Sequence, residues 1–63
     1  MFIKLTSAGG ETVWVNSRSI IKIHVIEYRR SPVSRLMLGR TVAIVREQPE
    51  EIRKMISEGE ATP

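Results

Sequence analysis

Apolar and polar residues alternate along most of this chain with a period of two, the spacing of a β-strand with one buried face. The alternation recurs in five short runs between Phe2 and Val45, separated by glycine, proline and small polar residues. Short runs between turn signals predict adjacent antiparallel strands. The expected strands cover residues 2–6, 12–15, 20–28, 35–38 and 41–45.

Turn chemistry places the connections between these strands. Gly9 and Gly10 accept the positive φ that a tight hairpin demands, and Gly39-Arg40 suits a two-residue turn with glycine first. Residues 16–19 are expected to form a polar corner. Residues 29–34 are expected to form a basic loop, because a proline within them cannot donate to a strand ladder.

The end of the chain changes from strand to helical periodicity. Pro49 suits the first helical position, and two glutamates follow it in the first turn, where the helix dipole favours negative charge. An apolar stripe then recurs at i, i+3 and i+4, as Ile52, Met55 and Ile56. The pattern predicts a helix over 49–57 that stops near Gly59. The remaining residues, 59–63, are predicted to be a flexible tail.

These elements predict a mainly β protein: a small five-stranded bent antiparallel sheet or barrel with one short C-terminal α-helix. A chain of 63 residues makes one domain, expected over 1–58. A domain of this size buries only about 60% of the surface that its unfolded chain exposes, so its core is small. The expected inward positions are Ile3, Leu5, Val13, Val15, Ile21, Ile23, Val25, Leu36, Leu38, Val42 and Ile44.

The opposite face of the expected sheet is also apolar. Its large side chains are Phe2, Trp14, Ile26, Tyr28 and Met37. We expect the helix stripe to dock on part of this face and the rest to form a homo-oligomer interface, in a dimer or a larger assembly. The alternative interpretation is that these five residues complete the core of a single chain.

Charge is distributed unevenly along the sequence. Residues 1–46 carry eight basic and two acidic side chains, a net charge of +6, whereas residues 47–63 carry five acidic and two basic, a net of −3. The candidate basic contact patch is Arg29, Arg30, Arg35 and Arg40. Such a patch attracts nucleic acid or an acidic protein face. The total charge of +3 is modest, so the favoured interpretation is a mixed surface of no specific function, with these two partners as alternatives.

The chain has few residue types that support catalysis. It contains no cysteine, no aspartate and one histidine, His24. A disulfide framework, a thiolate zinc site and a Ser-His-Asp triad are therefore excluded. Gly9-Gly10 also lacks the spacing of a phosphate-binding loop. We expect no enzyme, metal or cofactor, and instead a binding module with an unknown protein partner.

The sequence favours a cytoplasmic location without membrane insertion. No apolar run approaches the roughly 20 residues that a membrane-spanning helix needs. The first residues, Met1 to Leu5, show neither the hydrophobic region nor the cleavage site of a signal peptide.

Several short motifs resemble the FlbD (SwrD) family of small bacterial flagellar-operon proteins. In the first half they are Leu5-Thr6, Gly10-Glu11, Val13-x-Val15-Asn16, Ile20 and Ile23. In the second half they are Gly39-Arg40, Val45-Arg46-Glu47 and Glu50-Glu51-Ile52. The resemblance covers residues 1–57 and departs at the basic segment 29–34, which is longer here. It implies a small cytoplasmic protein without catalysis and associated with motility.

A weaker resemblance connects the chain to carbon-storage regulators of the CsrA type. These also open with Leu-Thr-x-x-x-Gly-Glu, here Leu5-Thr6 to Gly10-Glu11, and similarity continues through 21–27 and 45–47. This resemblance implies a dimer that binds messenger RNA through basic edge residues. The Gly-Ile/Val-x-Ala-Pro-Lys segment of that family does not occur before Val42, so this interpretation is second.

Overall fold

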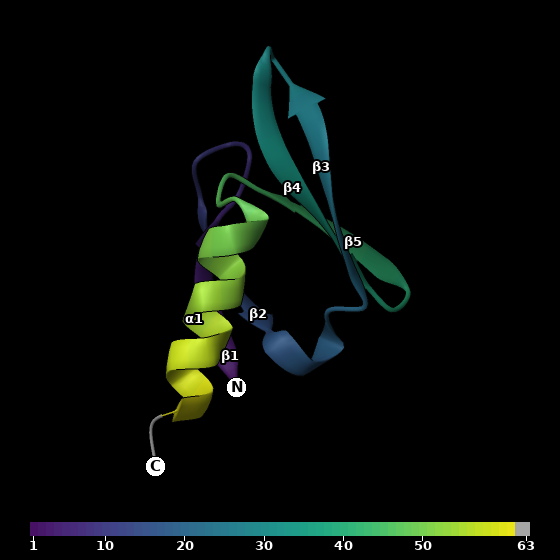
Figure 1. The fold of residues 1–63 in the computed structure, drawn as a ribbon. Coiled ribbons are helices and arrows are strands. Elements are labelled where there is room, and N and C mark those ends of the chain that lie inside the picture. Colours follow the sequence, from purple (N-terminus) through teal and green to yellow (C-terminus); the bar gives the residue numbers. More distant parts are fainter. Residues whose placement is uncertain (62–63) are drawn as a thin grey trace.

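Five strands and a C-terminal helix follow one another in the computed structural model, which describes residues 1–61 (Figure 1). The strands are β1 (Phe2–Thr6), β2 (Thr12–Asn16), β3 (Lys22–Tyr28), β4 (Ser31–Leu38) and β5 (Thr41–Val45). The helices are a 3-10 turn, η1 (Ser17–Ser19), and α1 (Pro49–Ala61). The predicted mainly β class with one C-terminal α-helix is confirmed.

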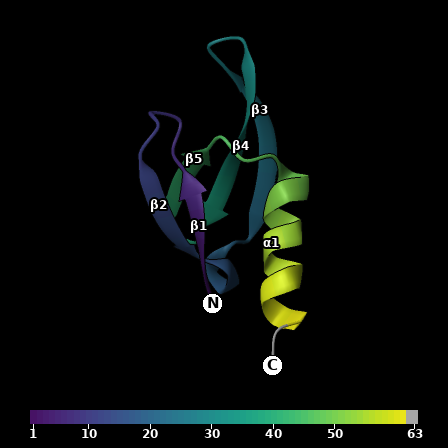
Figure 2. The ribbon, with the colours of Figure 1, turned by 90° about the vertical axis from the view of Figure 1, so that its left-hand side faces the viewer.

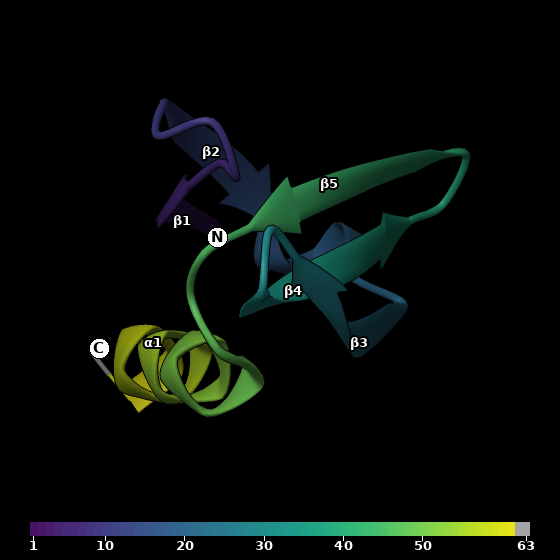
Figure 3. The ribbon, with the colours of Figure 1, turned by 90° about the horizontal axis from the view of Figure 1, so that it is seen from above.

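The strands form two antiparallel sheets, which are not closed into a barrel. One sheet is the hairpin β1-β2, and the other has the order β3-β4-β5 (Figure 3). A β-bridge between Ser7 and Val45 joins them just after β1 and at the end of β5. Two backbone bonds flank this bridge, from Arg46 N to Thr6 O at 2.8 Å and from Ala8 N to Ile44 O at 3.0 Å.

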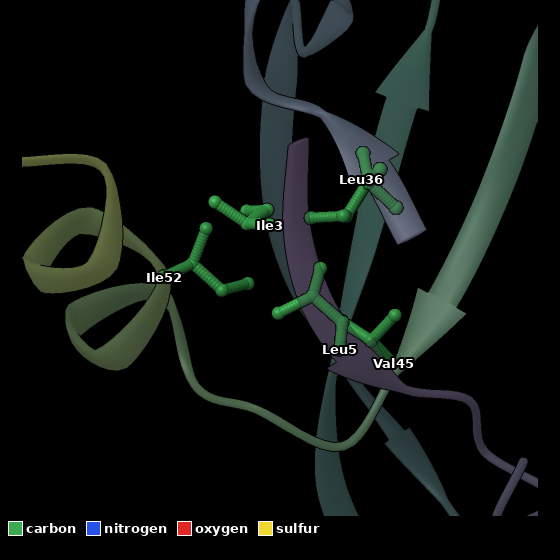
Figure 4. Packing of buried hydrophobic residues seen from close by; sticks show 6 residues of the cluster. Ile3, Leu5, Leu36, Val45 and Ile52 are labelled. Carbon is green, nitrogen blue, oxygen red and sulfur yellow. The ribbon is translucent and has the colours of Figure 1, made fainter. Parts of the chain in front are cut away.

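Hairpin β1-β2, the larger sheet and α1 enclose one hydrophobic core (Figure 4). Its buried members are Ile3, Leu5, Val15, Leu36, Val45 and Ile52. The helix stripe therefore packs against the inward faces of both sheets, and the prediction that it docks on the opposite face is wrong. Only three residues separate β5 from α1, so the helix begins beside the buried end of β5.

A polar junction joins the two sheets to the start of the helix. The Thr6 amide donates to both carboxylate oxygens of Glu47, at 2.9 and 3.0 Å. The Ser34 hydroxyl, fully buried, donates to the Glu47 carbonyl at 2.6 Å. Every polar group in this contact has a partner, as buried polar groups require. We call Thr6, Ser34 and Glu47 the junction.

The segment expected to be a basic loop is instead a tight hairpin. Strand β4 begins at Ser31, and only Arg29 and Arg30 form the turn, with φ of 48° and 66°. Pro32 is tolerated because it lies opposite Glu27, one residue from the closing Tyr28–Ser31 pair. The proline nitrogen, which carries no hydrogen, therefore faces away from β3. On that side β5 does not extend as far as Pro32, so no ladder hydrogen bond is lost.

The residues of β5 that face the core are the neighbours of those predicted to do so. The two-residue turn at Gly39-Arg40 is confirmed, and it places Leu38 opposite Thr41 and Leu36 opposite Ala43. Ala43 and Val45 therefore face the core, whereas Val42 and Ile44 face outward. Alternation could not decide this, because residues 42–45 are all apolar.

Two further residues predicted to face inward are exposed. Val25, on the edge strand β3, is 56% exposed, and Ile21, just before that strand, is 66% exposed. Their neighbour Ile23 is half-buried against the core. Position on a strand gives the face of a residue but not whether another element covers that face. The strand periodicity therefore predicted more core residues than the structure buries.

The helix is longer than its sequence pattern indicated. It starts at Pro49 as predicted but continues to Ala61, so neither the end at 57 nor the stop at Gly59 is correct. Gly59 instead permits a close approach, because the Met1 side chain occupies the space that a Cβ would need. Of the tail predicted over 59–63, residues 62–63 lie outside the described residues.

Candidate interaction surfaces

The outer face of hairpin β1-β2 carries two exposed aromatic side chains. Ile3 pairs with Val15 on the core side, so Phe2, Lys4 and Trp14 alternate to the outside. Phe2 is 65% exposed and Trp14 is 64% exposed. Lys4 lies directly opposite Trp14, and Phe2 is the diagonal neighbour of Trp14 across the hairpin. We call Phe2, Lys4 and Trp14 the aromatic face.

The other three residues of the predicted oligomer interface lie elsewhere. Ile26, Tyr28 and Met37 are on the outward face of the three-stranded sheet, where Ile26 and Met37 are half-buried. Met37 pairs with Lys22, six residues along β3 from Tyr28, which corresponds to about 20 Å. The structure therefore unites Phe2 with Trp14 but does not assemble all five into one patch.

The tip of hairpin β3-β4 is basic and projects from the rest of the molecule (Figure 1). The Arg29 guanidinium lies 5.4 Å from the centroid of the Tyr28 ring, within range of a cation–π contact. Neither Arg29 nor Arg30 forms an ion pair within residues 1–61. Both have left-handed backbone conformations, which are costly for residues other than glycine and asparagine.

The four arginines of the predicted basic patch do not form one surface. Arg29 and Arg30 precede β4 and Arg40 follows it, so they lie at opposite ends of an eight-residue strand. Arg35 is between them, exposed on the outward face opposite His24. The sequence indicated which cations are exposed but not how far apart the turns place them.

One basic residue near the hairpin tip was not among the binding residues predicted from the sequence. Arg46 and Arg29 line the same hollow of about 380 Å³, together with Ala8, Tyr28, Ser31, Pro32 and Val33. The Arg46 Nη2 atom donates to the Ala8 carbonyl at 3.2 Å, which holds its guanidinium beside the β1-β2 turn. Its position directly after β5 was the only signal in the sequence.

The remaining polar side chains do not assemble a metal site. Within the described part of the chain, no group of three or more His, Cys, Asp or Glu side chains could hold an ion. His24 is exposed on β3, and Glu50 and Glu51 are in the first turn of α1.

Two further findings concern the chain as a whole. Comparison with protein-family models, curated proteins and solved structures gives no match. Over residues 1–61, no helix has both the length and the apolar character needed to cross a bilayer.

Proposed function

We propose that this chain is a non-catalytic protein-interaction and assembly module that self-associates through its aromatic face. The observation that carries the proposal is the exposure of Phe2 and Trp14 side by side on one hairpin. Aromatic side chains each bury 150–250 Å² when covered, and tryptophan is among the residues that contribute most to protein interfaces. Two such residues left in water are an unfavourable surface for a monomer.

The aromatic face can pair with the same face of a second copy of the chain. A face that a single chain presents once can cover an identical face through a two-fold axis, which closes the assembly at a dimer. Self-association also adds burial to a domain whose size limits its core. The acidic helix lies on the other side of the hairpin, so it does not interfere with such contact (Figure 2).

An FlbD-like role in motility is part of the proposal. It is supported by the sequence motifs, such as Gly10-Glu11 in the first hairpin and Val45-Arg46-Glu47 after β5. The structure gives these motifs turn and junction positions, because Gly10 has φ of 95° and Glu47 binds the Thr6 amide. Location of the gene beside motor or hook genes is the observation that separates this role from others.

The substitution Trp14→Glu tests self-association. We expect the parent chain to sediment at twice its 7.2 kDa mass and the variant to sediment as a monomer, because the tryptophan contact is lost and a charged side chain is costly to bury even with Lys4 opposite it. Val42→Glu is the matched control, since Val42 is also an exposed apolar strand residue but belongs to the other sheet. A parent that remains a 7.2 kDa monomer at high concentration would refute the proposal.

A CsrA-like RNA-binding role is the second candidate. It is favoured by the hollow at the hairpin tip, where Tyr28 offers a ring and Arg29 and Arg46 offer positive charge. Proteins that bind single strands combine such rings with basic grooves. Since Arg40 is far from this tip and the net charge is only +3, we expect weak binding.

A further inference from the structure

The outer edge of β3 is unpaired over the length of the strand. β3 is the first strand in the order β3-β4-β5, and no backbone hydrogen bond within residues 1–61 joins its outer edge to another element. Edge strands are usually protected by proline, charged side chains such as lysine, a covering segment or very short length. This one has seven residues and no proline, and its one lysine, Lys22, is its first residue, so the rest of the strand is a template for an added strand.

The hairpin register identifies the backbone groups that are available. The two-residue turn makes Tyr28–Ser31 a hydrogen-bonded pair, and such pairs alternate along an antiparallel ladder. Even-numbered residues of β3 therefore direct their N–H and C=O groups to β4. Ile23, Val25 and Glu27 direct theirs outward, where an added strand would find them.

An apolar groove runs beside the core-facing side of this edge. It lies between β3 and α1, which are adjacent in Figure 2, and has a volume of about 480 Å³. Its lining residues are Ile23, Pro49, Glu50, Arg53, Ile56 and Ser57. Exposed Val25 lies two residues along the same face of β3 from Ile23. Aliphatic side chains of an added strand would occupy this groove.

The outward side of the same edge is basic. Lys22, on β3, and Arg35, on the neighbouring strand β4 opposite His24, are exposed on this side, and neither forms an ion pair among the described residues. Opposite charges across neighbouring strands are favourable and like charges are unfavourable. A second copy of β3 would bring only Lys22, His24, Ile26 and Tyr28 to this side. Charge complementarity therefore selects an acidic strand from another protein.

We propose that the free edge of β3 and the adjoining groove bind an extended segment of a partner protein in which aliphatic residues alternate with glutamate or aspartate. The aliphatic residues enter the groove, and the carboxylates face Lys22 and Arg35. The site is on elements other than the aromatic face, so it does not depend on self-association.

Amide exchange on the full-length chain tests the mode of binding. The probe is a synthetic end-blocked peptide of about seven residues that alternates valine and glutamate, a length typical of a strand. We expect bound peptide to slow exchange at the amides of Ile23, Val25 and Glu27. The amides of Lys22, His24 and Ile26 already bond to β4 and should change little.

Charge reversal tests the proposed specificity. By fluorescence anisotropy, a lysine version of the peptide should bind about tenfold more weakly than the glutamate version. Lys22→Glu with Arg35→Glu should reverse that preference. Arg18→Glu with Arg40→Glu makes the same change of net charge at exposed positions outside β3, the groove and the aromatic face, and should leave the preference intact.

Several outcomes would overturn the proposal. One is that the glutamate peptide does not bind the parent chain, and another is that it binds without the alternating exchange pattern. A third is that the control variant also reverses the preference for the glutamate peptide over the lysine peptide. Slow exchange at Ile23, Val25 and Glu27 without peptide, lost on dilution to monomer, would show that a second copy occupies the edge instead. Loss of self-association in Trp14→Glu with peptide binding unchanged would separate the two surfaces.

Discussion

The junction and the tip of hairpin β3-β4 are both polar, but they differ in how fully their groups are paired. At the junction, Glu47 accepts hydrogen bonds from both β1 and β4, and Ser34 is fully buried. At the tip, Arg29 and Arg30 are exposed, lack ion pairs within residues 1–61 and occupy left-handed conformations. Satisfied polar groups beside the core contribute to stability, whereas the two exposed guanidinium groups of the projecting turn have no ion pair among the described residues and only the Tyr28 ring beside Arg29.

The largest effect is expected from the core beside the junction. Ile52→Ala removes a fully buried aliphatic side chain, so it should lower the free energy of unfolding by about 2–4 kcal/mol. For a domain of this size the melting temperature should fall by at least about 10 °C. Val42→Ala, at an exposed strand position, is the control. Parent-like melting of Ile52→Ala would show that the helix is not packed in solution.

The junction itself should respond less strongly. Ser34→Ala leaves the Glu47 carbonyl without its 2.6 Å hydrogen bond in a buried setting, and we expect a loss of about 1–2 kcal/mol. Ser31→Ala, at an exposed position on the same strand, should be neutral in the same chemical denaturation experiment. Equal effects of the two substitutions would remove the distinction between junction and tip.

At the tip, substitution should increase stability. Arg29→Asn with Arg30→Gly places residues that tolerate positive φ in the two-residue turn, so a gain of about 1 kcal/mol is expected in denaturant titration. Gly39→Ala makes the opposite change in the other turn of the sheet, where φ is 73° and no atom lies within 4 Å of an added Cβ. That variant should lose a similar amount, from backbone strain alone.

The smallest effect concerns nucleic acid. We expect no sub-micromolar affinity for single-stranded RNA at physiological salt, and any weak binding should decrease steeply as salt is added. Fluorescence anisotropy against a salt series measures both properties. A tight complex that persists at high salt, and disappears in Arg29→Ala with Arg30→Ala, would contradict this expectation and favour the RNA-binding candidate.

The sequence by itself determined the elements and most of their boundaries. Strand periodicity, the Gly39-Arg40 turn and the Pro49 helix start all depend on local backbone preferences, which neighbouring residues in the chain are sufficient to specify. That the chain has no cysteine and no aspartate is likewise a matter of composition alone. Alternation also placed Phe2 and Trp14 on the strand faces opposite to Ile3 and Val15, although it did not show whether another element covers them.

Tertiary structure decided which surfaces are covered. Residues 42–45 are all apolar, so only the register set by the preceding turn directs Ala43 and Val45 into the core. Ile52 joins the inward faces because the short connection after β5 begins the helix there, which leaves the aromatic face exposed. Val25 and the edge of β3 remain open for a related reason: burial depends on contacts between distant segments, and alternation along one strand carries no information about them.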